Sequence, residues 1–482
     1  MPIARQTLVA ALPPEWLDDL LPHIQVQVEA AGSKIVVLDD DPTGNQTVHD
    51  VVVLTEWSLP LLIDAFREPA AVVYILTNTR SMSTNEARML NQQIGTRLKA
   101  ARKATNRDFV IVSRSDSTLR GHYPDETEAL AATLEMPFDA ILIVPFFLEG
   151  GRITAHDVHY VTEGEVLIPA AETEFARDAT FGYKHSNLRA WVSEKHRGAV
   201  APGGVASLTL EEIRCGGPDA VTAKLVSLRE GAVCIVNAIS YRDLEVVVAG
   251  LLTAEGQGKR FLYRTAASFV RVRGGIASQP LLSHADLFPG AERVPAATGG
   301  LTIAGSHVAK TTRQVAAAAA LPGVHRLEVA VPALLDDEQR NAEVARVVER
   351  AGALLEAGEE VLMATSRTVV DRAPNAAGKA RMGELAIGRQ ISTALVDIVR
   401  RLPVRPAWII AKGGITSSDI ATEALGVRRA WVMGQAIPGV PVWRTGSESC
   451  WPDLVYVVFP GNVGDDDALA QMIRILRGTN AS

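Results

Sequence analysis

Lys34-Ile-Val-Val-Leu-Asp39-Asp40-Asp41-Pro42-Thr43-Gly44 is the segment from which the architecture is most readily inferred. Four apolar residues precede three consecutive carboxylates, and a proline and a glycine then break the chain. This order predicts a buried β-strand that ends in a tight acidic loop. Because ligands of open α/β sheets bind at the carboxyl ends of the strands, the loop predicts a site that binds a metal, orients a hydroxyl or accepts a proton. A solvated acidic turn is the alternative.

The same order of strand, polar loop and helix recurs through the first 150 residues. Apolar, β-branched runs predict further strands at 51–55, 71–77, 109–113 and 140–144. Residues 59–66 and 86–104 have the apolar spacing of helices. This alternation is typical of βαβ units with a parallel sheet, so the first half of the chain is expected to be an α/β domain.

Polar and charged residues follow these strands. The candidate site residues are Asp40, Asp41, Thr43, Gly44, Arg80, Arg114, Asp116, Ser117 and Arg120, with Arg152 after the last strand. Bidentate guanidinium groups suit a carboxylate ligand, so carboxylates mixed with arginines predict a small, polar, anionic substrate. For any single arginine, a surface salt bridge is the alternative.

Two regions of the first half have open interpretations. Residues 1–33 have helical spacing and either cap the first domain or contribute to a homodimer. Residues 151–185 contain His156 and His159, whose spacing suits a metal, followed by an acidic segment. A polar loop that closes over the substrate is the favoured interpretation of 151–185, and a solvated surface is the alternative.

A Pro/Gly-rich passage separates the two halves of the chain. It predicts an α/β domain over 34–285, a linker over 286–300 and a second α/β domain over 301–482. In the second domain, strands at 300–305, 408–412 and 454–459 each run into a turn of small residues. Such turns expose backbone N–H groups, and Ser or Thr at 416–418 can cap the following helix, so a nucleotide or phosphate site is predicted.

Composition excludes some classes of protein. The chain has 482 residues, is 47% hydrophobic and carries a net charge of −7, so neither nucleic acid nor an acidic membrane is an expected partner. Its three cysteines are too far apart for a zinc site or a disulfide framework. No positively charged segment followed by a long apolar run stands at the N-terminus, so a cytoplasmic protein is expected.

The ordered set of motifs resembles the four-carbon acid sugar kinases, once catalogued as a domain of unknown function. The resemblance rests on five segments after residue 33: Asp40-Asp41-Pro-Thr43-Gly44, Arg114-Ser-Asp116-Ser117-Thr118-Leu-Arg120-Gly121, Gly305-Ser306 with Thr312 and Gln314, Gly413-Gly414-Ile415-Thr416-Ser417, and Gly461-Asn462-Val463-Gly464. It implies two α/β domains with mainly parallel sheets and flanking helices, and an active site in the cleft between them. One domain would bind the acid sugar and the other ATP.

The resemblance also implies the reaction, which is phosphorylation of the terminal hydroxyl of threonate, erythronate or a 3-oxo-tetronate. Asp40 or Asp41 is then expected to serve as the base, with Thr43, Gly44, Arg80, Arg114, Asp116, Ser117 and Arg120 around the substrate. ATP is expected at Ser306, Thr312, Gly413, Gly414, Ile415, Thr416, Gly461, Asn462, Val463 and Gly464. Mg²⁺ follows from nucleotide chemistry, and its ligands are left open.

Two other functions remain open at this point. Asp39-x-Asp41-x-Thr43 also fits the nucleophile loop of haloacid-dehalogenase-type phosphatases, with Asp39 attacking phosphorus and Asp41 as acid/base. The repeated Gly-rich turns of the second half would then have no role. A non-catalytic sensor of a sugar acid or nucleotide is the third interpretation, and the intact acidic loop argues against it.

Overall fold

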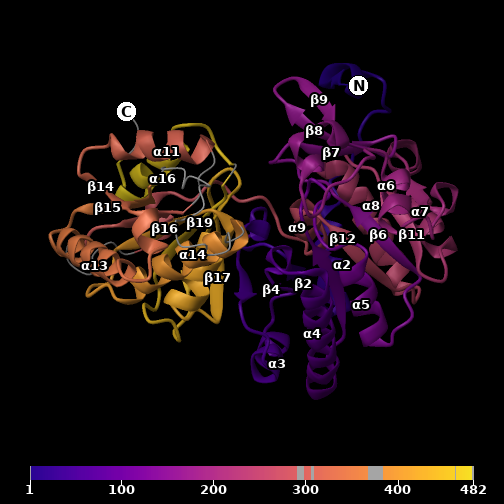
Figure 1. Cartoon of the computed structure of the whole chain (residues 1–482). Helices are drawn as coiled ribbons and strands as arrows, with labels where there is room; N and C mark the ends of the chain where they lie inside the picture. The colour runs from indigo at the N-terminus through magenta and orange to yellow at the C-terminus, as the bar shows by residue number, and fades with distance from the viewer. Residues whose placement is uncertain (1, 290–297, 306–308, 367–383, 462, 480–482) are drawn as a thin grey trace, which may run out of the picture. The chain divides into compact units, whose positions relative to one another are not determined.

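The computed structural model describes residues 2–289, 298–305, 309–366, 384–461 and 463–479 (Figure 1). The chain consists of two compact units, Met1–Gln279 and Pro280–Ser482. Both combine a sheet of mainly parallel strands with flanking helices, which confirms the predicted α/β class. The bounds of the proposed domains and linker stay a prediction. Within the described ranges, no helix combines the length and the apolar character needed to span a membrane.

Unit 1 is built on a parallel sheet with the strand order β10-β11-β6-β12-β5-β2-β4-β3. The strands are β2 (Lys34–Asp39), β3 (Val51–Leu54), β4 (Val72–Leu76), β5 (Phe109–Arg114), β6 (Ala140–Val144), β10 (Ala206–Leu208), β11 (Ala232–Val236) and β12 (Phe261–Thr265). The strands predicted around the acidic loop are confirmed. The sequence did not reveal β12, which lies between β5 and β6.

Helices bury the faces of this sheet. They are α1 (Arg5–Ala10), α2 (Leu21–Ala31), α3 (Leu59–Arg67), α4 (Thr84–Thr105), α5 (Asp125–Leu134), α6 (Leu188–Lys195), α7 (Leu210–Ser227), α8 (Tyr241–Gly256) and α9 (Ala267–Arg273). Phe66, Ile94 and Leu130, from α3, α4 and α5, share one apolar core with β2, β4 and β5. Ser83 and Glu86 form a capping box that begins α4 directly after the loop that follows β4.

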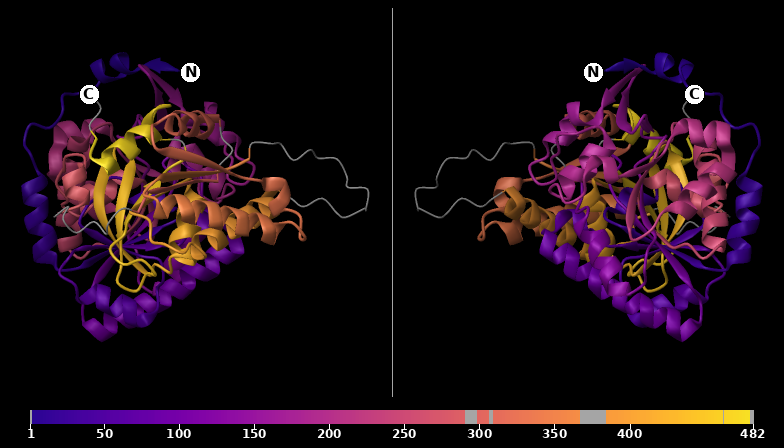
Figure 2. Two further views of the ribbon diagram at one scale, coloured as in Figure 1. Left: turned by 90° about the vertical axis from the view of Figure 1, so that its left-hand side faces the viewer. Right: turned by 90° about the vertical axis from the view of Figure 1, so that its right-hand side faces the viewer.

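A second, antiparallel sheet of order β1-β9-β8-β7 stands beside the main one. Its strands are β1 (Ile3–Ala4), β7 (Arg152–Ala155), β8 (Val158–Glu163) and β9 (Val166–Pro169). The expectation of a polar loop over 151–185 is therefore wrong for these segments, because β8 alternates buried and half-exposed residues as a strand does. Figure 2 shows β1, in indigo beside the N label, at the edge of this sheet.

The first 33 residues pack on unit 1. β1 pairs with β9, and α2 packs on α8 and α9. The Gln25 amide donates a 2.9 Å hydrogen bond to the carbonyl of Gly275, and Arg214 donates to the carbonyl of Pro13. The structure thus places the extension against unit 1, and the predicted homodimer stays a prediction.

Unit 2 has the strand order β17-β18-β19-β16-β13-β15-β14. The strands are β13 (Leu301–Ala304), β14 (Val324–Val329), β15 (Glu360–Thr365), β16 (Trp408–Lys412), β17 (Arg429–Ile437), β18 (Val440–Thr445) and β19 (Val455–Phe459). The helices are α10 (His284–Leu287), α11 (Ala309–Ala319), α12 (Val331–Leu334), α13 (Arg340–Glu356), α14 (Glu384–Arg400), α15 (Gly414–Asp419) and α16 (Ala468–Arg477). Only β18 runs antiparallel to its neighbours β17 and β19 among the pairings described. β13, β16 and β19 are adjacent, so the turns that follow them lie at one edge of the sheet.

Candidate active site

The acidic loop lies where β2 ends, between the ends of β4 and β5. Asp40 is 4% exposed and accepts two hydrogen bonds from Arg80, at 2.6 Å from Nη2 and 3.3 Å from Nε. The Ser115 hydroxyl also donates to Asp40. Burial alone would raise the pKa of Asp40, but the charges of Arg80, Arg114 and Arg264 outweigh it and the pKa lies below its ordinary value. Asp40 is therefore an ionised anchor whose two oxygens are already engaged.

Asp41 is more open. Its side chain is 20% exposed, and Oδ1 accepts hydrogen bonds from the backbone N–H and the hydroxyl of Thr43. These bonds cap the 3₁₀ turn Pro42–Asn45. Oδ2 lies 3.6 Å from Arg80 Nη1. One carboxylate oxygen is thus held by the protein, while the other is oriented by a cation and available to a ligand.

Asp39 differs from both neighbours. It is 1% exposed, and its Oδ1 accepts a 3.1 Å hydrogen bond from Arg114, while Oδ2 is buried with no hydrogen-bond partner. Burial, partly offset by Arg114 and reinforced by Asp40 and Asp41, raises the pKa of Asp39 to about 7. A group so enclosed cannot act as the nucleophile of a phosphatase, so the fold does not favour the phosphatase interpretation.

We expect Asp39→Asn to remove part of the pH dependence of stability. The unfolded chain releases this proton near the ordinary value of 3.8, whereas the folded protein keeps it to about pH 7. The folded state binds more protons in this window, so its free energy of unfolding falls as pH rises, by at most about 1.4 kcal/mol per pH unit. Urea unfolding across this pH range should show that the free energy of unfolding of the variant rises relative to that of the wild type as pH rises. Parallel curves for the two proteins, like those expected for the surface variant Asp64→Asn, would contradict the assignment.

Gly44 is required by the position of Asp39. A Cβ atom there would lie 2.1 Å from both carboxylate oxygens of Asp39. We therefore expect Gly44→Ala to lower the free energy of unfolding by about 1–3 kcal/mol, the usual cost of overpacking. Gly203→Ala is the matched control, since a Cβ at Gly203 meets no atom within 4 Å. Chemical denaturation measures both variants, and equal stabilities would show that the loop yields to the added methyl group.

The loop after β5 completes this cluster. Arg114 is 5% exposed and lies 3.1 Å from Asp39 and 3.8 Å from Asp40. Asp116 accepts a 2.6 Å hydrogen bond from Arg120 Nε, and its other oxygen lies 3.9 Å from Arg80. Burial opposes ionisation of Asp116, but Arg80 and Arg120 hold its pKa well below the ordinary value. Ser117 is buried, and its carbonyl accepts a hydrogen bond from His159.

The structure therefore brings together nearly all the predicted residues of unit 1. The acidic loop, Arg80, Arg114, Asp116 and Arg120 form one network, and Ser117 is joined to His159 rather than to the carboxylates. His159 is buried between Ser117 and Thr154, and burial lowers its pKa to about 4. His156 is exposed. The two histidines therefore do not form a metal pair.

Two further arginines lie close to the network, of which the sequence indicated Arg152 but not Arg264. Arg264, from β12, is 5% exposed and donates a 3.0 Å hydrogen bond to the carbonyl of Arg120. It also stabilises ionised Asp40 electrostatically. A Cβ at Gly121 would lie 3.2 Å from Arg264 and 2.6 Å from the Ser115 hydroxyl, so the glycine lets this loop close over both. The short Phe-Leu-Tyr-Arg-Thr pattern of β12 was the available signal. The other arginine, Arg152, begins β7.

In unit 2, the turn after β16 is shaped by glycine. Gly413 has φ 108° and occupies the N-cap of α15, without a side-chain cap. The expectation that Ser or Thr caps this helix is wrong: Ser417 instead donates to the carbonyls of Ala411 and Gly413. A Cβ at Gly305 would lie 2.8 Å from the Thr416 hydroxyl oxygen, so the turns after β13 and β16 touch. Gly414 begins α15, and Ile415 is 63% exposed.

The turn after β19 is fixed from α11. Gln314 donates to the carbonyls of Val463, at 3.0 Å, and Asp465, at 2.6 Å. Gly464 has φ 79°. Lys412 donates to the carbonyl of Pro460 at 3.1 Å, and burial, aided by the charge of Lys310, lowers its pKa to about 7.

The remaining predicted nucleotide residues give less information. Gly461 has no atom within 4 Å of an added Cβ. Thr312 lies on the exposed side of α11. Ser306 and Asn462 lie outside the described residues. The described part of unit 2 therefore brings three strand ends together, with Gly305, Gly413 to Thr416 and Val463 to Gly464 at one edge of the sheet.

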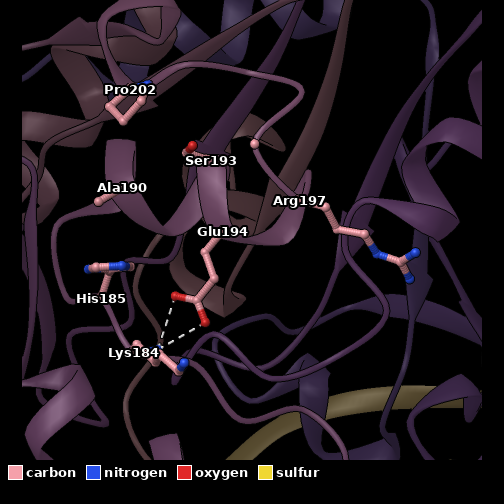
Figure 3. A pocket seen from close by; sticks show the side chains of 8 residues that line it. Lys184, His185, Ala190, Ser193, Glu194, Arg197 and Pro202 are labelled. Atoms are coloured by element: carbon pink, nitrogen blue, oxygen red, sulfur yellow. Dashed lines mark hydrogen bonds between the residues drawn. The ribbon is translucent and has the colours of Figure 1, made fainter.

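A separate hollow of about 480 Å³ lies over α6 (Figure 3). Glu194 and Lys184 face it, with the carboxylate of Glu194 accepting from the backbone N–H of Lys184. None of the residues predicted from the sequence lines it. Among the residues that the structure describes, no group of three His, Cys, Asp or Glu side chains is arranged to hold a metal ion. In the acidic loop, the arginines already supply the positive charge that a metal ion would bring to the carboxylates.

Comparison with known families agrees with this organisation. A family model described as a sugar-binding N-terminal domain matches residues 35–273, and one described as a nucleotide-binding C-terminal domain matches residues 301–469. The chain is 26% identical to the D-threonate kinase of Salmonella typhimurium over 91% of its own length and 97% of that protein. It is 27% identical to the 3-oxo-tetronate kinase of Methylobacterium radiotolerans, covering 86% of this chain and 90% of the relative.

Solved structures share the fold. A protein from Salmonella typhimurium LT2 superposes with a TM-score of 0.65 at 18% identity, covering 92% of this chain and 99% of the other. A protein from Haemophilus influenzae gives 0.59 at 19% identity, with 91% and 99% covered. The two domain matches and the kinase relatives span most of the sequence in the predicted order. The chain thus belongs to the four-carbon acid sugar kinase family and is a phosphotransferase.

Proposed function

We propose that this protein transfers the γ-phosphoryl group of ATP to the terminal hydroxyl of a four-carbon sugar acid such as threonate, erythronate or 3-oxo-tetronate. The observation that carries the proposal is the network of carboxylates and arginines around Asp40, Asp41 and Arg80, built at the strand ends of the sugar-binding region. The kinase relatives support the class of acceptor.

In this proposal, Asp41 is the base or the hydroxyl anchor. Asp40 is engaged on both oxygens and Asp39 is enclosed, whereas the side chain of Asp41 is partly exposed, with its Oδ2 beside Arg80. The acceptor oxygen forms a bond to Pγ, the bond from Pγ to the bridging oxygen breaks, and ADP leaves. The hydroxyl proton passes to Asp41. Before the transfer Arg80 orients the Asp41 carboxylate, and during it Arg80 offsets negative charge that develops in the transition state.

The nucleotide is assigned to unit 2. Its turns after β13, β16 and β19 offer backbone N–H groups at one sheet edge, and the nucleotide-binding family match covers all three. Lys412 is buried beneath the turn after β19 and donates to the carbonyl of Pro460, so it supports the shape of that turn. Mg²⁺ bound with ATP would neutralise the phosphates, and oxygen-rich ligands such as phosphates and water suit that ion without a protein cage.

Coupled ADP release with ATP and Mg²⁺ tests the proposal against a panel of four-carbon sugar acids. Turnover with one of them supports the kinase. Phosphate release from phosphorylated acids without ATP would instead identify a phosphatase, and ATP or acid binding without any turnover would identify a sensor.

A further inference from the structure

Arg152 is a largely buried arginine without a carboxylate partner among the described residues. Its Nη1 donates to the carbonyl of Gly150, and its Nε is buried with no hydrogen-bond partner. Burial lowers the pKa of Arg152, and the negative charge of Asp116, which makes no ion pair with it, offsets this cost only in part. A cation placed in this way is suited to an anion that arrives from outside the chain.

Three other arginines of the cluster already have an ionised carboxylate as partner. Arg80 lies 2.6 Å from Asp40, Arg114 lies 3.8 Å from Asp40, and Arg120 lies 2.6 Å from Asp116. Arg264 is buried beneath the loop that contains Gly121. A ligand therefore cannot reach Arg264, whereas it can reach a half-buried side chain. Arg152 is therefore the arginine of this cluster that is partly exposed and, within the described part of the chain, has no carboxylate at ion-pair distance.

Phe175 holds Arg152 next to Arg120. The Arg120 guanidinium carbon lies 5.2 Å from the centre of the Phe175 ring, and that of Arg152 lies 5.6 Å from it. The two cations repel one another, so that Arg120 adds to the effect of burial in lowering the pKa of Arg152, while Asp116 opposes it. An aromatic face orients planar guanidinium groups, and an anion that contacts Arg152 would relieve the repulsion.

The order of contacts separates this pair from Asp41. Asp41 is beside Arg80, Arg80 is 3.9 Å from Asp116, and Asp116 binds Arg120, which shares Phe175 with Arg152. Asp41 and Arg152 are thus the first and the last member of one contiguous series of contacts. A short chain with a hydroxyl at one end and a carboxylate at the other matches this arrangement.

We propose that Arg152, oriented by Phe175, recognises the carboxylate of the substrate and so determines the preference for acids over uncharged polyols. The inference rests on the proposed function, because it takes the acceptor to be a sugar acid whose distal hydroxyl meets Asp41. In this arrangement the protein's own carboxylates are held by Arg80, Arg114 and Arg120, and the carboxylate of the ligand is bound by Arg152.

The test compares the wild type with Arg152→Met, Arg152→Lys and the control Arg177→Met, an exposed arginine of the same segment as Phe175. Each protein is assayed with the preferred four-carbon acid and with the uncharged four-carbon polyol, and binding of the acid is measured by calorimetry. We expect Arg152→Met to lower kcat/KM for the acid by about 10²-fold or more, because a lost charged contact leaves buried polar groups unpaired. Its kcat/KM for the polyol should be unchanged, Arg152→Lys should keep part of the preference, and Arg177→Met should behave as the wild type.

An equal loss with acid and polyol would assign Arg152 a structural role and overturn the inference, as would an unchanged acid preference. Acid that binds the wild type without turnover, and no longer binds Arg152→Met, would support the inference while contradicting the proposed reaction. A wild type that neither binds nor phosphorylates any acid of the panel would overturn both.

Discussion

Replacing Asp41 with asparagine is expected to lower kcat by about 10²–10⁴-fold, the usual contribution of a positioned general base. Asparagine keeps an oxygen that can accept from Thr43 and fits the same volume, so the fold of the loop should persist. It cannot take the hydroxyl proton, and it loses the charge that lies 3.6 Å from Arg80. Steady-state kinetics with ATP and the preferred acid measures the effect, which should fall on kcat more than on KM.

The companion variant is Asp64→Asn, which removes an exposed carboxylate from α3. It should keep the activity of the wild type. If Asp41→Asn retained full kcat while Asp40→Asn lost it, the base would have to be Asp40, and the open oxygen of Asp41 would be irrelevant to the chemistry.

Replacing Arg80 with methionine is expected to lower the free energy of unfolding by about 3–5 kcal/mol, the cost of removing one partner from a buried ion pair. Arg80 donates twice to Asp40 and lies near Asp41 and Asp116, so three carboxylates lose their shared cation. Activity should fall with it, because Asp41 is no longer oriented. Chemical denaturation measures the loss, and Arg88→Met, at the exposed pair with Asp125, should change stability by less than about 1 kcal/mol.

Acid unfolding provides a second measurement of the Arg80 variant. In the wild type, the pKa of Asp40 lies below its ordinary value, so its ion pair contributes stability at neutral pH and loses it as pH falls through that lowered pKa. Without Arg80 the pKa of Asp40 rises, and acid unfolding should begin at a higher pH. The double variant Arg80→Met/Asp40→Asn should recover part of the lost stability. If the double variant lost more free energy of unfolding than the two single variants lose together, an ion pair would be refuted as the cause.

Much of the sugar-binding half could be predicted because its signals are local. The apolar run before Asp39 and the carboxylates after it identify a buried strand and its terminal loop from eleven residues. Parallel strands then place the polar ends of β2, β4 and β5 at one edge. The pairing of Arg80 with Asp40 and the enclosure of Asp39 depend on side-chain packing, which no spacing in the sequence specifies.

The elements that were missed depend on long-range contacts. β12 is a short strand whose place between β5 and β6 comes from pairing with residues more than a hundred positions away, and Arg264 was overlooked with it. The strands within 151–185 are brief and partly polar, so the sequence predicts a loop there, yet β1 at the N-terminus pairs with β9 to complete a small sheet. Arg152, which the sequence indicated, begins β7 of that sheet.

The proposed phosphoryl transfer is examined by incubating the wild-type protein with ATP, Mg²⁺ and each four-carbon sugar acid, and locating the transferred phosphorus by ³¹P NMR. We expect ADP formation with at least one acid and a phosphate ester on its terminal carbon. A folded protein that binds ATP and yields no phosphate ester with any acid of the panel would contradict the proposed transfer.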